Sequence, residues 1–192
     1  MTGEALEEVR AALARHGLLF AHDPVLPSVT TIVAGAPVAG SWWGHPAGQA
    51  IFRVLTDLED EVAWPKLVDG KVTLVHRTLW PALAAVGAAR QTWQTRGVSA
   101  ALLAAADRVA DEGEVAAADL DLTSRDATTL ERRLLVLGKQ RHTELGRHER
   151  VLSSWSHLAR GEPRPDADDA KKRFEKAIAP WKGGRLPWTL RA

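Results

Sequence analysis

The residues best suited to chemistry in this chain are basic and hydroxyl side chains between positions 125 and 147. Apolar residues spaced by three or four predict a helix over residues 125–137, whose outward positions are rich in Arg and Thr. A hairpin over residues 139–152 adds cations at alternate positions. Such side chains donate to phosphates and base edges, although an exposed helix and hairpin would be polar in any case. The candidate nucleic-acid-binding residues are Arg125, Thr128, Thr129, Arg132, Arg133, Lys139, Arg141 and Arg147.

The charge of the chain is divided along its length. Residues 1–123 hold nine Lys/Arg and fifteen Asp/Glu, whereas residues 124–192 hold sixteen Lys/Arg and nine Asp/Glu. A positive excess confined to one part of a chain favours a polyanionic partner, and a basic, merely solvated tail is the alternative. Because the cations gather on one helix and one hairpin, we expect binding to nucleic acid, and to duplex DNA in particular.

A second cluster is aromatic. Trp42 and Trp43 are followed by Gly44, and His45 stands where the pattern predicts a helix to begin. In the favoured interpretation the two rings pack on the core between two structural units, and His45 accepts a hydrogen bond at the helix start. In the other, Trp42, Trp43 and His45 form a pocket in which the rings stack on an unpaired base and His45 donates to a phosphate.

The sequence gives little support for a thiol, metal, phosphate-loop or serine-nucleophile site. The chain has no cysteine, which excludes thiolate catalysis, disulfides and Cys-ligated metal sites. His142 and His148 flank the turn of the second hairpin, but two imidazoles without a third ligand do not make a zinc site. A Gly-rich phosphate loop and a Gly-x-Ser-x-Gly motif are both missing from the sequence. We expect no metal and no cofactor, and a binding role is favoured over an enzymatic one.

The elements that must position these residues occur twice in the same order: a helix, a hairpin with Gly in its turn, and a Trp that begins another helix. In the first copy the Asp69-Gly70 pair predicts a type I′ turn that places Lys66 opposite Thr73. Pro65 cannot donate to a ladder, so its strand should lie at a sheet edge. The two copies consist of the predicted helices 46–61 and 125–137 and the predicted hairpins 62–77 and 139–152. Trp80 and Trp155 begin the helices that follow these hairpins.

Further helices precede and follow each copy. Caps and apolar spacing predict helices over 2–16, 80–96, 99–112, 116–120 and 168–179, with residues 26–33 either helical or extended. Helix, short segment, helix and hairpin form the order of a winged helix-turn-helix. The sequence therefore predicts an α+β, mainly helical fold with two tandem winged-helix units, over 1–97 and 98–160, and a C-terminal helix and tail over 161–192.

With this architecture and the Leu26-Pro27-Ser28-Val29 segment, the chain resembles the AlkZ-type DNA glycosylases, which remove alkylated bases and act on crosslinks. The resemblance implies a link to DNA repair. Those enzymes carry a Gln-x-Gln or Gln-x-Asp catalytic pair, whereas here neither Gln49 nor Gln91 has a matching residue two positions on. The resemblance therefore implies DNA binding without the glycosylase activity.

The sequence favours a nucleic-acid-binding protein. Two alternatives remain: a protein–protein adaptor that docks through its Trp-rich first unit, and an enzyme that uses Trp42, Trp43 and His45 as a base-stacking pocket. The chain has no apolar run long enough to span a bilayer and no signal-peptide pattern, so we expect a cytoplasmic protein without a membrane partner.

Overall fold

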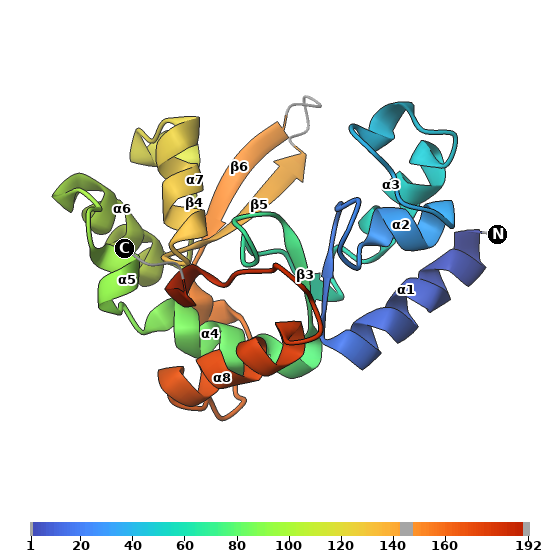
Figure 1. Ribbon diagram of the computed structural model, residues 1–192. Helices are drawn as coiled ribbons and strands as arrows, with labels where there is room; N and C mark the ends of the chain where they lie inside the picture. Colours follow the sequence, from blue (N-terminus) through green and yellow to red (C-terminus); the bar gives the residue numbers. More distant parts are fainter. Residues whose placement is uncertain (1, 143–147, 190–192) are drawn as a thin grey trace.

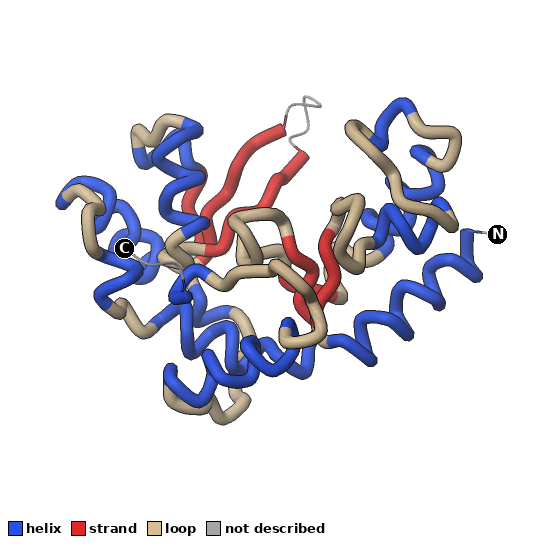
Figure 2. Tube along the Cα trace, in the orientation of Figure 1, coloured by secondary structure: helices blue, strands red, loops and turns tan. Residues whose placement is uncertain are grey.

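The computed structural model describes residues 2–142 and 148–189, which form a mainly helical α+β fold with two small antiparallel sheets (Figures 1 and 2). Each described sheet has three strands, in the orders β1-β3-β2 and β4-β6-β5. The predicted fold class is confirmed at this level. None of the described helices is long and apolar enough to cross a membrane.

The first sheet is built by the N-terminal half of the chain. Its strands pair Leu18 with Val75 and Val62 with His76, which leaves β2, next to Pro65, at a sheet edge as predicted. The elements are α1 (Thr2–His16), β1 (Leu18–Phe20), α2 (Val29–Ala34), a 3₁₀ turn (Trp42–Gly44), α3 (Gly48–Asp57), β2 (Val62–Ala63) and β3 (Thr73–His76).

The second sheet is built by a later part of the chain, in which helices and strands follow one another in a similar order. The longest described pairing joins the two strands of the second hairpin, from Leu137 opposite Ser153 to His142 opposite His148. The elements are α6 (Ala100–Glu112), β4 (Glu114–Ala116), a 3₁₀ turn (Ala117–Leu120), α7 (Ser124–Arg132), β5 (Leu137–His142) and β6 (His148–Ser153).

The remaining elements join the two halves. They are α4 (Trp80–Ala88), α5 (Thr92–Thr95), α8 (Ala167–Ile178) and the 3₁₀ turns Arg77–Leu79, Trp155–His157 and Pro187–Thr189. One buried cluster takes residues from both halves and from the tail, among them Phe20, Leu134, Trp155, Phe174 and Trp181. Burial of this shared apolar surface fixes one sheet relative to the other.

Several helix boundaries match the sequence prediction because their capping residues act as expected. The first helix spans Thr2–His16, and Gly17 follows it with a φ of 75°. Ser99 accepts from the backbone N–H of Leu102 at the start of α6. The segment that the sequence left undecided is the helix α2, whose N-cap is Ser28.

The first hairpin contains the predicted turn but not the predicted register. Asp69 and Gly70 have φ values of 52° and 67°, as a type I′ turn requires, and the N–H of Lys71 bonds the Val68 carbonyl. Lys66, however, lies opposite Val72 rather than Thr73. One extra residue before the turn, a bulge at Leu67, accounts for the shift, because it lets the successive side chains of Leu67 and Val68 both be buried.

The longest helix predictions were wrong at their ends. The predicted helix 125–137 stops at Arg132, because Leu134 adopts a left-handed φ of 50° and the chain then enters β5. Its apolar positions are buried all the same, which is why the helical spacing continued past the true end. Similarly, α4 ends at Ala88 rather than near residue 96, α3 begins at Gly48 rather than at Pro46, and β4 occupies Glu114–Ala116 before a 3₁₀ turn.

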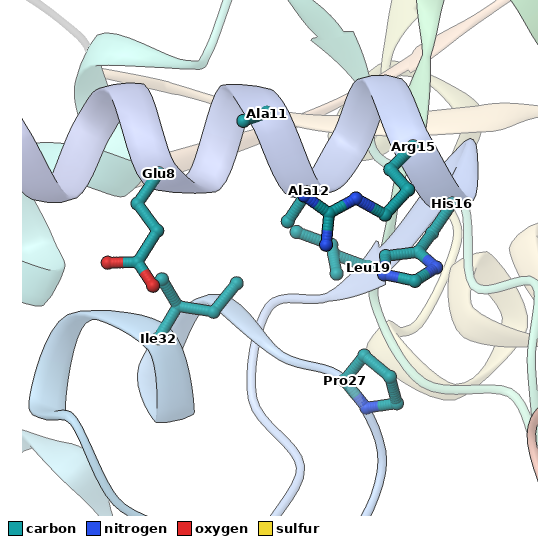
Figure 3. Close-up of a pocket in the computed structure, with 8 residues that line it drawn as sticks. All are labelled: Glu8, Ala11, Ala12, Arg15, His16, Leu19, Pro27 and Ile32. Carbon is teal, nitrogen blue, oxygen red and sulfur yellow. The ribbon is translucent and has the colours of Figure 1, made fainter.

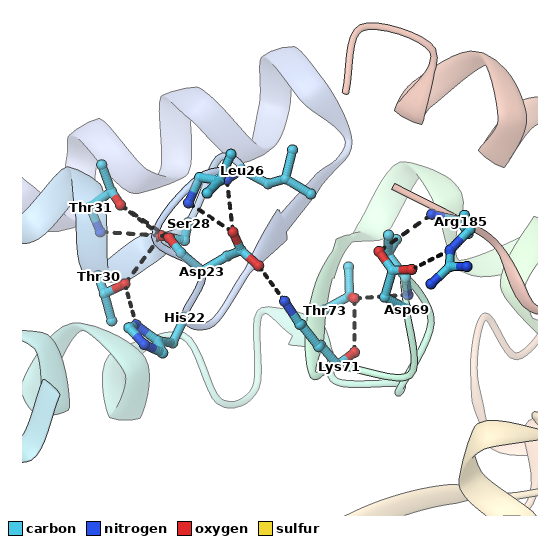
Figure 4. A network of polar contacts seen from close by, with 12 residues as sticks. His22, Asp23, Leu26, Ser28, Thr30, Thr31, Asp69, Lys71, Thr73 and Arg185 are labelled. Carbon is cyan, nitrogen blue, oxygen red and sulfur yellow. Dashed lines mark hydrogen bonds and ion pairs between the residues drawn. The ribbon is translucent and has the colours of Figure 1, made fainter. Parts of the chain in front are cut away.

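A polar network ties the loop after β1 to the first hairpin (Figure 4). Asp23 accepts from the backbone N–H groups of Val25 and Leu26, and its other oxygen lies 2.6 Å from Lys71 Nζ. Burial by itself would raise the pKa of the Asp23 carboxyl, but the bonds from Lys71 and the two backbone amides prevail and lower this pKa. The network therefore holds the loop with an ionised carboxylate at its centre.

Candidate nucleic-acid interface

The helix α7 is fixed on its inner side and carries cations on its outer side. Thr123 and Asp126 form a capping box at its start, and Ala127 and Leu130 are fully buried. Arg125 and Arg132 are exposed, and neither forms a salt bridge with any residue that the structure describes. Together with Thr129 they occupy positions i, i+4 and i+7, which makes one outward stripe.

Two of the predicted contacts are used inside the protein instead. The guanidinium of Arg133 donates to the Trp93 carbonyl and is half-buried, so the expectation that it points outward was wrong. The hydroxyl of Thr128 donates to the Ser124 carbonyl and accepts from Arg150. The hydroxyl of Thr129 donates to the Arg125 carbonyl in the same way, but Thr129 lies on the outward stripe. Of the predicted contacts on α7, the stripe of Arg125 and Arg132, which are exposed, and Thr129, which is half-buried, stays open to a ligand.

A buried carboxylate that sequence reasoning missed joins α7 to both hairpins. The side chain of Glu131 is 7% exposed and lies 2.5 Å from Lys66 Nζ of the first hairpin and 2.7 Å from Arg150 Nη2 of β6. A side chain on Gly138 would lie 2.0 Å from Glu131 Oε1, so the glycine makes room for this carboxylate. Arg150 is therefore neutralised internally, and the structure sets the angle between α7 and the hairpins through one acid and two cations.

Arg132 lies where α7 meets the turn of the first hairpin. A side chain on Gly70 would come within 3.0 Å of Arg132 Nε, so Gly70 allows the guanidinium to lie across the turn. A hollow of about 210 Å³ is lined here by Arg132, Asp69 and Arg185, among others. Arg185 Nε is 3.0 Å from Asp69 Oδ1, a contact drawn in Figure 4. Because Asp69 neutralises Arg185 and not Arg132, the hollow keeps a positive charge at its α7 side.

The second hairpin carries one exposed cation among its described side chains, on the strand face turned away from α7, because the neighbouring Gly138 faces Glu131. Lys139 on β5 has a side chain 58% exposed, with its Nζ 3.9 Å from a carboxylate oxygen of Glu114. Arg141 occupies the next position on the same strand face, opposite Glu149, but its side chain lies outside the described residues. Arg147 also lies outside them. In Figures 1 and 2 the hairpin extends from the sheet beside α7 toward the upper edge of the molecule.

The two histidines of this hairpin occupy paired positions. His142 and His148, which flank the predicted turn, lie opposite each other in the strand register, and their side chains lie outside the described part of the chain. Among the residues described, no group of three or more His, Asp or Glu side chains is arranged to hold a metal ion.

The aromatic cluster lies on the surface and not in the core between the two halves. The rings of Trp42 and Trp43 stack with centroids 4.2 Å apart, and Phe52 of α3 lies 5.8 Å from Trp43. Trp43 is 67% exposed and Phe52 is 47% exposed, so the interpretation of the Trp pair as a core cap was wrong. His45 Nδ1 accepts from the backbone N–H of Ala47 at 3.1 Å, so it is an acceptor as expected, but it does not cap α3, which begins at Gly48 with Ala47 as its N-cap.

A separate hollow of about 280 Å³ lies between α1 and the segment that leads into α2 (Figure 3). Its walls are mostly the aliphatic side chains of Ala12, Leu19 and Ile32, and Arg15 and His16 stand at one end. The charged groups do not converge on a common point in this hollow. It lacks the few convergent polar groups that orient a small ligand, so we place the candidate site elsewhere.

The acidic excess of residues 1–123 is concentrated in one segment. Residues 98–123, which include α6, hold one Lys/Arg and six Asp/Glu, whereas residues 1–97 hold eight Lys/Arg and nine Asp/Glu. The aromatic cluster therefore belongs to a nearly neutral part of the chain.

No protein-family model, curated protein or solved structure matches this chain. The resemblance to AlkZ-type glycosylases therefore stays a hypothesis drawn from the sequence, and the case for a function rests on the geometry described above.

Proposed function

We propose that the protein binds nucleic acid, with duplex DNA as its partner, through the outward stripe of α7 and the β5–β6 hairpin. The observation that carries the proposal is the exposure of Arg125 and Arg132 along one face of a helix that is followed directly by a two-stranded hairpin bearing Lys139. Guanidinium and ammonium groups displayed in this way neutralise phosphates, which is the main source of affinity in DNA binding.

The order of elements supports the same proposal. In each half a helix, a strand, a short helix or turn, a second helix and two further strands follow one another, with the last strand between the other two. We interpret both halves as winged-helix units, in which α3 and α7 hold the position of the recognition helix and β5–β6 is a wing. The sequence resemblance adds a link to DNA repair as a further hypothesis.

A charge-reversal pair tests this interface. We expect Arg125→Glu/Lys139→Glu to weaken binding to a 20-bp duplex at least about tenfold and to lower the slope of log K against log salt by about 2. The matched control is Arg173→Glu/Lys176→Glu on α8, an equal change in net charge on exposed residues at the opposite edge of the molecule in Figure 1. Fluorescence anisotropy in a salt titration measures both quantities.

Three outcomes show whether this interface binds DNA. Weakening confined to the α7 and β5 pair supports the interface. An equal loss in the α8 control would show that only net charge matters, and a duplex affinity below detection in the wild-type protein at low salt would refute the proposed function.

A further inference from the structure

The helix α3 occupies in the first half the position that α7 occupies in the second, yet it displays different chemistry. Both helices directly precede the two strands that complete their sheet. The exposed side chains of α3 include Gln49, Phe52, Arg53 and Thr56, which recur at the spacing of one helix face. Where α7 presents cations, α3 therefore presents an aromatic ring with one cation beside it and one exposed acid, Asp57, at its C-terminal end.

The ring of Phe52 belongs to a larger aromatic surface. Trp43 stacks on Trp42 at an interplanar angle of 21° and lies at 41° to Phe52. Although Trp42 covers one face of the Trp43 ring, 67% of the Trp43 residue is exposed, which leaves room for another flat ring. A side chain on Gly48 would lie 2.9 Å from the Trp42 carbonyl, so the glycine lets this loop close on α3 and holds the rings in place.

The surroundings of the rings suit a nucleic acid. Arg53 is exposed next to Phe52 and forms no salt bridge with any described residue, so its guanidinium is free for a phosphate. In Figure 1 the loop before α3, the β5–β6 hairpin and α7 all extend to the upper edge of the molecule, whereas α8 lies along the lower edge. The segment that carries Trp42 and Trp43 thus lies at the same edge of the molecule as the proposed duplex interface.

The size of the apolar surface argues against a protein partner. Large hydrophobic side chains exposed among the described residues are those of Val25, Trp43, Phe52 and Val72, and just two of these belong to the cluster. A whole aromatic side chain presents about 150–250 Å². The exposed parts of two rings are far smaller than the roughly 800 Å² that each partner contributes to a standard protein interface. One or two stacked bases match this area.

We propose that Trp43, supported by Trp42 and Phe52 and flanked by Arg53, is a stacking platform for unpaired bases of single-stranded nucleic acid. Base–aromatic stacking tolerates any sequence because every base has a π-face. Combined with the proposed function, on which this inference rests, the platform predicts a preference for duplexes that carry a single-stranded overhang.

The test compares a blunt 20-bp duplex with the same duplex carrying a six-nucleotide overhang that contains 2-aminopurine, a base whose fluorescence is quenched on stacking. We expect the wild-type protein to bind the overhang duplex more tightly and to quench the probe. Trp43→Ala should lose about fivefold or more of the overhang affinity, together with the quenching, while its affinity for the blunt duplex is unchanged. Trp43→Phe should restore part of both signals.

The matched control is Val25→Ala, which truncates an apolar side chain that is 84% exposed outside the cluster. It should behave as the wild-type protein does. If Trp43→Ala binds and quenches the overhang as well as the wild type does, the platform is refuted although duplex binding stands. If the blunt duplex is not bound but a single-stranded oligonucleotide is bound through Trp43, the proposed α7 interface fails and the platform survives. A concentration-dependent dimer that Trp43→Ala abolishes would instead assign these rings to an interface between copies of the chain.

Discussion

The buried carboxylate of Glu131 offers the sharpest test of how the two halves are held together. In Glu131→Gln the shape of the side chain is kept, but Lys66 and Arg150 lose the negative charge that both of them contact. The Lys66 and Arg150 side chains are 22% and 24% exposed, so water compensates only part of the loss. Breaking a buried ion pair by removing one partner costs about 3–5 kcal/mol, and this partial exposure favours the lower end, about 3 kcal/mol.

For a domain of this size, about 3 kcal/mol corresponds to a fall in Tm of about 6–12 °C. Thermal unfolding followed by circular dichroism, together with urea unfolding for the free energy, measures the effect. Glu112→Gln is the matched control, because Glu112 pairs with Arg108 while both side chains are 48% exposed. An exposed pair of this kind contributes at most about 1 kcal/mol.

A double-mutant cycle separates the link between the halves from the rest of the network. Lys66→Met should destabilise the wild-type protein, because it leaves Glu131 with Arg150 alone, and should cost much less in the Glu131→Gln background. If Glu131→Gln and Glu112→Gln melt within about 2 °C of each other, the carboxylate does not hold the halves together and the reasoning is refuted.

Two further predictions concern stability. The pKa of Asp23 is lowered in the folded protein, so the stability that its carboxylate contributes is present above the unfolded pKa of about 3.9 and is lost as pH falls through the folded pKa. We therefore expect Asp23→Asn to be less stable than the wild type at pH 7 and to lose less Tm between pH 4 and pH 2. A fall in Tm over this pH range as steep as that of the wild type would contradict this. A side chain on Gly87 would lie 2.3 Å from the Trp155 ring, so Gly87→Ala should cost at least about 1–3 kcal/mol in urea unfolding, whereas Gly44→Ala, with open space around it, should cost far less.

The helices with strong caps were predictable from the sequence because their signals are local. The Thr2–His16 helix and the Ser99 cap depend on residues within one turn of the boundary. The end of α7 was not predictable in this way, since Leu134 and Leu137 are buried in the structure and would also be buried in a longer helix. The spacing of apolar residues indicates which residues are buried. It does not indicate the left-handed φ at Leu134, where the helix ends.

The type of the candidate site could be predicted from the sequence, but the residues that form it could not. Composition places cations on α7 and the hairpin, and Arg125 and Arg132 are exposed as expected. Whether a given cation is free depends on acceptors far away in the sequence, as the Trp93 carbonyl is for Arg133 and Glu131 is for Arg150. Such pairings are tertiary contacts across 40 and 19 positions, and no local pattern indicates them.

The recurrence of Trp after each hairpin has a structural explanation that separates it from function. Trp80 Nε1 donates to the Val75 carbonyl at 3.0 Å, and Trp155 Nε1 donates to the Leu134 carbonyl at 2.9 Å. In both copies the indole therefore bonds back to the chain that precedes it and packs into the shared core. The repeated residues build the scaffold.

What differs between the two copies is the outward face of the helix before each hairpin. The second copy presents Arg125 and Arg132, and the first presents Phe52 beside Trp43. Because the Glu131 network and the shared core fix the halves relative to each other, these faces are held apart at a set distance before any ligand arrives. A ligand that contacts both faces then loses little free energy in ordering the protein. A recurring order of elements with different outer faces thus suits the partner that we propose, which has two different parts, a charged duplex and an unpaired strand.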